Sequence, residues 1–239
     1  MKIQGITFGV GTPWDRVAAV AASQMQKMTG VECHVITSRT SKSHPSWEKC
    51  RAFQYLPKAD VLVVFDADIF CLRPWSPLQM WQKAGRRLCL VHEPPNALTQ
   101  NECRLYGLDA NSYCNGGLYI AGKKEDQNFL ESVREDYWPQ YGSWLEQTGL
   151  NKHIQLKAHP IAPLPLIYNQ LVNAPLEGEA LQQRVTTLRR SPCVNAHFAG
   201  RGNNISPILE LFKLLAKQGK NATAPRVPKT LYKARCRKN

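Results

Sequence analysis

The chain has 239 residues, of which 43% are hydrophobic, and a formal net charge of +13. This length and apolar fraction are typical of a folded domain with a sizeable core, and no run of about 18 apolar residues is present to form a transmembrane helix. The eight cysteines form no C-x-x-C pair, which argues against a zinc site. Several of them lie inside apolar runs, which predicts reduced thiols in the core.

Much of the positive charge lies at the carboxyl end, where residues 220–239 hold seven Lys and Arg and no acidic residue. Such a run is typical of a solvated tail, and the alternative is an anchor to anionic lipid or to an acidic acceptor. We therefore expect one domain over residues 1–218 and a basic tail over residues 219–239. Residues 1–5 lead straight into a strand pattern without a signal-peptide layout. We therefore expect a cytoplasmic protein, or a catalytic domain from a longer one. Membrane contact through the tail is a further option.

Strand-like and helix-like stretches alternate along the chain, which predicts an α/β fold with a mostly parallel, Rossmann-like sheet flanked by helices. Strands are expected over residues 3–10, 31–37, 60–65, 87–92 and 113–121, with further strand-like stretches at 185–188 and 193–198. Helices are expected over residues 14–28, 47–56, 76–84, 125–137, 166–173 and 205–218. The intervening residues 38–45, 93–111 and 139–164 are expected to be loops or irregular.

An apolar run from Val61 to Phe65 ends in two carboxylates, Asp66 and Asp68. Short apolar runs rich in Val are typical of buried strands, and open α/β sheets place their ligands at the carboxyl ends of such strands. Two carboxylates at that point are suited to hold a divalent cation against a diphosphate. The alternative is a strand end followed by an Asx-type turn.

Three further stretches follow the D-x-D pair in order: residues 113–122 (YCNGGLYIAG), 168–173 (YNQLVN) and 195–200 (NAHFAG). Together with the D-x-D pair, they resemble the nucleotide-sugar glycosyltransferases of the GT-A fold, and most closely glycosyltransferase family 8. That family shows a D-x-D at a strand end, then an F-N-[SA]-G strand, D-Q-x-x-L-N and H-F-x-G. The opening strand, loop and Ala-rich helix also resemble it, so the likeness covers about residues 3–205.

The resemblance implies a divalent cation, Mn²⁺ or Mg²⁺, bound by Asp66, Asp68 and His197. A neutral imidazole combines with carboxylates on Mn²⁺, and the cation offsets the charge that grows on a departing diphosphate. Asp66 is expected to contact the donor as well. The alternative for His197 is a structural histidine beside Phe198.

The resemblance also implies which residues contact the donor. Gly9, Gly11 and Thr12 are expected to form the loop at the donor base, where relatives carry acidic residues. Lys49 stands where the family has a Lys or Arg that contacts the donor, and the alternative is a surface lysine.

Asn115 and Gly116 are expected near the sugar, because an Asn side chain both donates to and accepts from hydroxyl groups, while a β-bulge is the competing explanation. Gly200 and Arg201 are expected at the diphosphate. On the acceptor side, residues 92–95 (HEPP) follow a strand end and are expected to line the cleft.

Asn169 and Gln170 match an Asp-Gln pair that lies near the anomeric carbon in the family. An amide at residue 169 has no ionised carboxylate, so a covalent route through it is excluded. If the anomeric configuration is retained, as the family implies, a front-face displacement with Gln170 steadying the oxocarbenium-like centre is favoured. An inactive or weakly hydrolytic relative is the remaining option.

The sequence therefore predicts a metal-dependent glycosyltransferase that moves a hexose from a nucleotide sugar, here a UDP-sugar, to a glycan or glycolipid acceptor. One alternative is a sugar-nucleotide nucleotidyltransferase. Such an enzyme requires a Gly-rich loop with a basic residue, and residues 9–12 (GVGT) match that loop only weakly. Another is a non-catalytic protein that binds nucleic acid through the basic tail, which leaves Asp66, Asp68 and His197 unexplained.

Overall fold

The computed structural model describes residues 1–38, 44–141, 146–172, 180–198 and 205–218. Within these residues the strands are β1 (Ile3–Phe8), β2 (Cys33–Ile36), β3 (Val61–Phe65), β4 (Ile69–Cys71), β5 (Leu88–His92), β6 (Cys114–Gly122), β7 (Ile161–Leu164), β8 (Gln170–Leu171) and β9 (Asn195–His197). The α-helices are α1 (Trp14–Thr29), α2 (Ala52–Tyr55), α3 (Pro77–Lys83), α4 (Ala97–Tyr106), α5 (Lys123–Tyr141), α6 (Glu146–Lys157), α7 (Leu181–Arg190) and α8 (Ile205–Gln218). The 3₁₀ helices are η1 (Pro45–Arg51), η2 (Ala110–Ser112) and η3 (Leu166–Tyr168).

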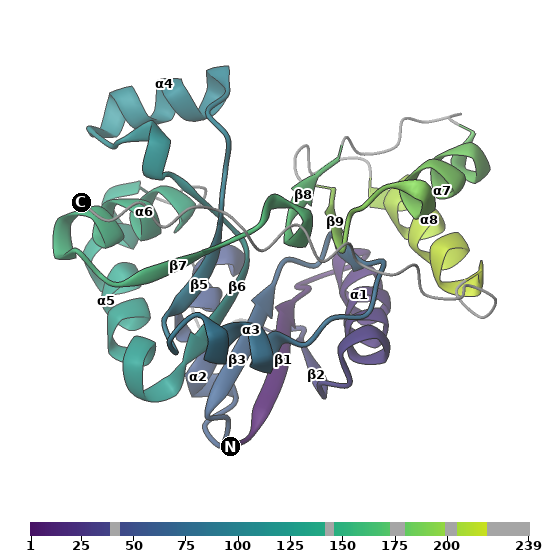
Figure 1. Cartoon of the computed structure of the whole chain (residues 1–239), viewed down its shortest axis with the longest axis horizontal. Helices are drawn as coiled ribbons and strands as arrows, with labels where there is room; N and C mark the ends of the chain where they lie inside the picture. Colours follow the sequence, from purple (N-terminus) through teal and green to yellow (C-terminus); the bar gives the residue numbers. More distant parts are fainter. Residues whose placement is uncertain (39–43, 142–145, 173–179, 199–204, 219–239) are drawn as a thin grey trace.

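Six strands form the central sheet in the order β2-β1-β3-β6-β5-β7. The pairs β1–β2, β1–β3 and β5–β7 are parallel, and β6 runs antiparallel to both of its neighbours. Helices pack on both faces of this sheet (Figure 1). The predicted α/β fold with a mostly parallel sheet is confirmed.

The central strand β3 shows why the sheet is covered on both faces, because all five of its residues are buried. Val63 and Phe65 point into the cluster formed with α1 and α8, whereas Leu62 and Val64 point into the cluster formed with α5 and α6. This alternation is the two-residue period of a strand, applied to a run without polar residues. The carboxyl end of β3 is therefore fixed from both sides.

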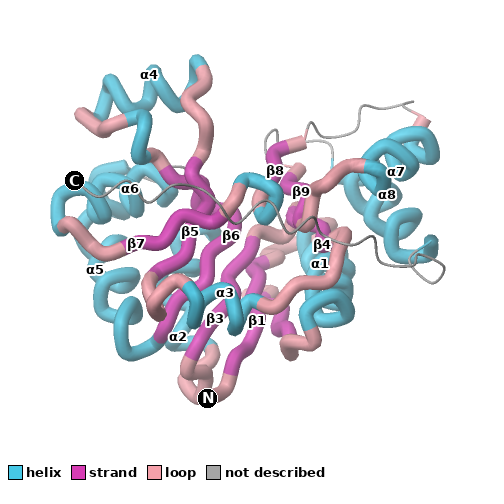
Figure 2. The backbone as a smooth tube through the Cα atoms, in the orientation of Figure 1, coloured by secondary structure: helices cyan, strands magenta, loops and turns pink. Residues whose placement is uncertain are grey.

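A second, three-stranded sheet has the order β4-β9-β8 and lies between the central sheet and the helices α7 and α8 (Figure 2). The antiparallel pairing of β4 with β9 joins residues just after the D-x-D pair to the carboxyl-terminal part of the chain. The short strand β4 is absent from the sequence prediction. It places residues that are far apart in sequence next to each other.

Several predicted elements were wrong. Residues 185–188 belong to the helix α7, because Val185 and Leu188, three residues apart, share one helix face and pack with α8 in the core. The segment 139–164, expected to be irregular, contains α6 and β7, and the segment 93–111 contains α4. The expected helix over 166–173 is the 3₁₀ turn η3 followed by the strand β8.

The seven cysteines among the described residues are free thiols, and six of them are buried, as predicted. None of the helices within those residues is long and apolar enough to cross a bilayer. The predicted tail over residues 219–239 lies outside the described residues.

Candidate active site

The two carboxylates of the D-x-D pair lie at the carboxyl end of β3, in a turn that leads into β4. The backbone N–H of Asp66 donates to the carbonyl of Gly117 at 2.7 Å, and the N–H of Ile69 donates to the carbonyl of Asp66 at 3.1 Å. The first bond holds the strand end against β6, and the second closes the turn. The backbone of both carboxylates is therefore fixed by the sheet.

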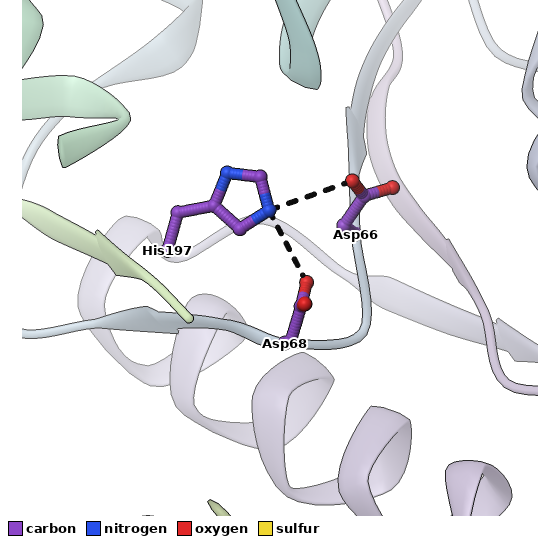
Figure 3. A group of neighbouring side chains, drawn as sticks. All are labelled: Asp66, Asp68 and His197. Carbon is purple, nitrogen blue, oxygen red and sulfur yellow. Dashed lines mark ion pairs between the residues drawn. The ribbon is translucent and has the colours of Figure 1, made fainter. Parts of the chain in front are cut away.

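His197 reaches these carboxylates through the pairing of β4 with β9. Ile69 lies opposite His197 in that pairing, and the N–H of Phe198 donates to the carbonyl of Asp68 at 3.0 Å. Figure 3 shows one ring nitrogen of the imidazole facing both carboxylates. The structure thus brings together the three residues that the sequence predicts as metal ligands.

The geometry of this cluster suits a divalent cation. The Nε2 atom of His197 lies 3.3 Å from Asp68 Oδ1 and 3.6 Å from Asp66 Oδ2. One ligand atom from each residue falls within 4.8 Å of the others. Oxygen and nitrogen ligands of a six-coordinate ion, with bonds of about 2.1 Å, lie about 3 Å apart in neighbouring positions. The donor set therefore fits a divalent cation.

Charge and burial compete in setting the protonation of the cluster. Burial lowers the pKa of His197, but the carboxylates of Asp68 and Asp66 together outweigh it, and the pKa is raised. Burial raises the pKa of Asp68, but the nearby His197 outweighs it, and the pKa is lowered. Burial likewise raises the pKa of Asp66, and the neighbouring Lys49 offsets this only in part. Without a cation, the carboxylates therefore favour the protonated form of His197.

Gly117 leaves the space that the imidazole fills. A Cβ atom at this position would lie 2.3 Å from His197 Cε1 and 2.7 Å from its Nδ1, closer than real Cβ contacts. The Nδ1 atom is buried and has no hydrogen-bond partner among the described residues. A histidine that binds a metal through Nε2 carries its proton on Nδ1, the tautomer that this arrangement leaves available.

Lys49 lies in η1 and is only 3% exposed, so it is not a surface lysine. Its Nζ atom donates to Asp66 Oδ1 at 2.8 Å and to the carbonyl of Gly116 at 3.1 Å, and it lies 2.9 Å from Glu146 Oε1. Burial lowers the pKa of Lys49, but the two carboxylates outweigh it, and the pKa is raised. All three ammonium hydrogens thus have partners within the protein.

Asn115 and Asn169 form part of a buried hydrogen-bond network. The side-chain oxygen of Asn115 accepts from the N–H of Gly117 at 2.8 Å and from Asn169 Nδ2 at 2.7 Å. The Nδ2 atom of Asn115 donates to Glu93 Oε2 at 3.0 Å. Gln170, the predicted catalytic residue, is partly exposed and lies opposite Ala196 in the β8–β9 pairing, one residue from His197.

The glycines of the predicted base loop have structural roles. A Cβ atom on Gly9 would lie 2.5 Å from the carbonyl oxygen of Trp14, so only glycine fits between β1 and α1. Gly11 has a φ of +83° and its carbonyl accepts from the N–H of Asp15 in the first turn of α1. Thr12 is exposed beside them.

Two predicted donor contacts, Gly200 and Arg201, lie outside the described residues. Sequence reasoning missed Glu146, which starts α6 in a segment expected to be irregular. It proposed residues 92–95 for the acceptor cleft, and in the structure the side chain of Glu93 accepts a hydrogen bond from Asn115. Glu93 does follow a strand end, and this signal marked it as a residue close to the site.

No family model and no curated protein matches the chain. Among solved structures, the galactosyltransferase LgtC in complex with donor and acceptor sugar analogues is 13% identical, with a TM-score of 0.57 over 95% of this chain and 98% of that chain. A glycosyltransferase involved in the glycosylation of the major capsid of PBCV-1 is 11% identical, with a TM-score of 0.54 over 91% of this chain and 100% of that chain. The mouse xyloside xylosyltransferase 1 in its apo form is 9% identical, with a TM-score of 0.52 over 85% and 99%. The chain has the GT-A fold of glycosyltransferases.

Proposed function

We propose that this protein is a metal-dependent glycosyltransferase that moves a hexose from a UDP-sugar to a glycan or glycolipid acceptor with retention of configuration. The observation that carries the proposal is the cluster of Asp66, Asp68 and His197 at the carboxyl end of a central strand in a GT-A fold. These three side chains come from two distant parts of the chain and offer one oxygen or nitrogen ligand each.

In this proposal Asp66, Asp68 and His197 hold Mn²⁺ or Mg²⁺. Such a cation stabilises the negative charge that develops on a leaving diphosphate. A direct contact of Lys49 with the donor requires that one of its three internal bonds break, so we assign Lys49 to the orientation of Asp66. Gly200 and Arg201 remain proposed diphosphate contacts, and Gly9, Gly11 and Thr12 remain the proposed base loop.

Gln170 and Asn169 are the proposed catalytic residues. Gln170 is partly exposed and follows Asn169, which donates a hydrogen bond to Asn115 beside the candidate metal cluster, and this neighbourhood supports a role for its amide close to the anomeric carbon. Asn169 has no ionisable group, so we propose a front-face displacement in which the departing phosphate oxygen takes the proton of the acceptor hydroxyl. We further propose that residues 1–218 form the catalytic domain of a cytoplasmic protein and that the basic tail contacts anionic membranes.

The test is the release of nucleoside diphosphate from a panel of UDP-, GDP- and ADP-hexoses, measured with Mn²⁺ and with EDTA. We expect metal-dependent release from one donor, and NMR of the product is expected to show the anomeric configuration of that donor. Asp68→Asn is expected to abolish the metal-dependent release and to leave the circular dichroism spectrum unchanged, because the backbone carbonyl of residue 68 still bonds Phe198. Release that is equal with EDTA, or an Asp68→Asn variant of normal activity, contradicts the metal role.

A further inference from the structure

A chain of three buried polar side chains runs from the end of β5 to the residue before β8. Glu93, Asn115 and Asn169 are 8%, 5% and 1% exposed. Glu93 accepts from Asn115, and Asn115 accepts from Asn169. This chain lies directly beside the candidate metal cluster, because the place of the missing Cβ of Gly117 is 2.9 Å from Asn115 Oδ1 and 2.7 Å from His197 Nδ1.

The orientation of the Asn115 amide is fixed from both ends. Its nitrogen faces Glu93 Oε2, and a carboxylate accepts hydrogen bonds but donates none. Its oxygen faces the backbone N–H of Gly117, which only donates. A flipped Asn115 would place an oxygen against a carboxylate and an NH₂ group against an N–H, so only one orientation satisfies both neighbours. The bond to Glu93 is the stronger of the two constraints because its acceptor is charged.

The fixed amide of Asn115 in turn fixes Asn169. The atom of Asn169 that faces Asn115 Oδ1 at 2.7 Å must be the donor Nδ2, so the carbonyl oxygen faces the other way. That oxygen is buried and accepts no hydrogen bond from the described residues. Buried carbonyl oxygens without a partner are rare, because water-free surroundings make them costly. The unsatisfied oxygen points to a ligand that donates a hydrogen bond.

We propose that Glu93 is a positioning residue that orients the amides of Asn115 and Asn169, so that Asn169 offers its carbonyl oxygen to a hydroxyl group of the donor sugar. This inference rests on the proposed function, which supplies the sugar nucleotide. It explains how an amide serves at residue 169 in place of a carboxylate: the network selects the oxygen and leaves the NH₂ group engaged. The site then has a neutral acceptor and adds no further negative charge next to the diphosphate.

The test exchanges donor and acceptor across the Glu93–Asn115 bond. In Asn115→Asp, two carboxylates face each other. In the double variant, which carries Glu93→Gln as well, the side-chain NH₂ group introduced at position 93 donates to the new carboxylate. Gln147 Nε2, which lies 3.4 Å from Glu93 Oε2 in the wild type, loses that acceptor and keeps the hydroxyl of Tyr113 at 3.3 Å. The amide oxygen at position 93 still accepts from Asn96, which donates to Glu93 Oε1 at 3.0 Å in the wild type. The bonds of residue 115 to Gly117 and Asn169 are the same in the double variant. Affinities for the active sugar nucleotide of the panel and for its nucleoside diphosphate are measured at pH 8 by calorimetry.

We expect Asn115→Asp to lower the affinity for the sugar nucleotide about tenfold or more. The affinity for the nucleoside diphosphate is expected to change by less than about twofold. We expect the double variant to regain most of the lost affinity. Asn169→Asp, which turns a carboxylate toward Asn115 Oδ1, is also expected to lower the affinity for the sugar nucleotide. A double variant no better than Asn115→Asp, an equal loss for both ligands, or tighter binding by Asn169→Asp overturns the inference.

Failure of the proposed function is a separate result. If the wild-type protein binds and cleaves no sugar nucleotide, the proposed function is refuted, and so is the proposed contact of Asn169 with the sugar. The orienting role of Glu93 is then tested by melting temperatures alone. We expect Asn115→Asp to melt below the wild type and the double variant to recover, and equal melting temperatures for the two variants overturn that role.

Discussion

The buried ammonium group of Lys49 offers a direct test of how the site is held together. Methionine at this position keeps an unbranched apolar stem and removes the bonds to Asp66, Glu146 and the carbonyl of Gly116. Both carboxylates then lose their cation within a largely buried environment. We therefore expect Lys49→Met to lower the free energy of unfolding.

The size of the loss follows from the exposure of the partners. Removing one member of a buried ion pair costs about 3–5 kcal/mol. The side chains of Asp66 and Glu146 are 30% and 15% exposed, so water screens part of the charge that is left behind. We expect a loss of about 3 kcal/mol, at the lower end of that range. In a protein of this length, this lowers the melting temperature by about 6–12 °C.

The assay is guanidinium and thermal unfolding in EDTA and in millimolar Mn²⁺. Mn²⁺ is expected to raise the melting temperature of Lys49→Met more than that of the wild type, because an added cation replaces the lost charge beside Asp66. Lys213→Met is the matched control: Lys213 is 48% exposed, pairs with Glu210 on α8, and is expected to change stability by less than about 0.5 kcal/mol. A Lys49→Met protein as stable as this control refutes the reasoning.

Two further predictions concern neighbours of the cluster. Gly117→Ala places a methyl group 2.3 Å from His197 Cε1 and is expected to weaken Mn²⁺ binding about tenfold or more. The control is Gly116→Ala, whose methyl group stays 3.5 Å from its nearest neighbour and which is expected to bind Mn²⁺ normally. Equal Mn²⁺ affinities of the two variants in a calorimetric titration would count against the fit of His197 to Gly117. Glu146→Gln tests the pH dependence of stability. Burial raises the pKa of Glu146, but Lys49 outweighs it and the pKa is lowered, so the carboxylate stabilises the fold above its unfolded pKa of about 4.3 and ceases to do so as the pH falls through its folded value. The stability difference between wild type and Glu146→Gln is therefore expected to be large at pH 7 and to shrink progressively as the pH falls below about 4.3 toward the folded pKa, and a constant difference would contradict the ion pair.

The sequence predicted the cluster of candidate metal ligands because its signals are local. Asp66 and Asp68 follow a continuous apolar strand, and His197 lies in a short motif with its own family likeness. Buried strands such as β3 are also readable from sequence, since each of their residues faces a core. These features depend on a few consecutive residues and not on distant partners.

The helix α6 was missed because its buried face mixes polar and apolar residues. Thr148, Asn151 and His153 are buried beside Leu150 and Ile154, so the apolar periodicity that marks a helix is weak. Asn151 is buried because of its tertiary contacts: it bonds both the N–H and the carbonyl of Cys114 on β6. Such a role is invisible until the partner strand is known. Because α6 was not predicted, Glu146 and its ion pair with Lys49 were not predicted either.

The pairing of β4 with β9 has a consequence for the order in which the protein is built. Asp68 and His197 are separated by more than half of the chain, so a nascent chain carries the two carboxylates long before their histidine has been synthesised. Contacts this distant in sequence form late in folding, after the loop-closure entropy has been overcome. The candidate metal site is thus complete only once the carboxyl-terminal part has docked on β4.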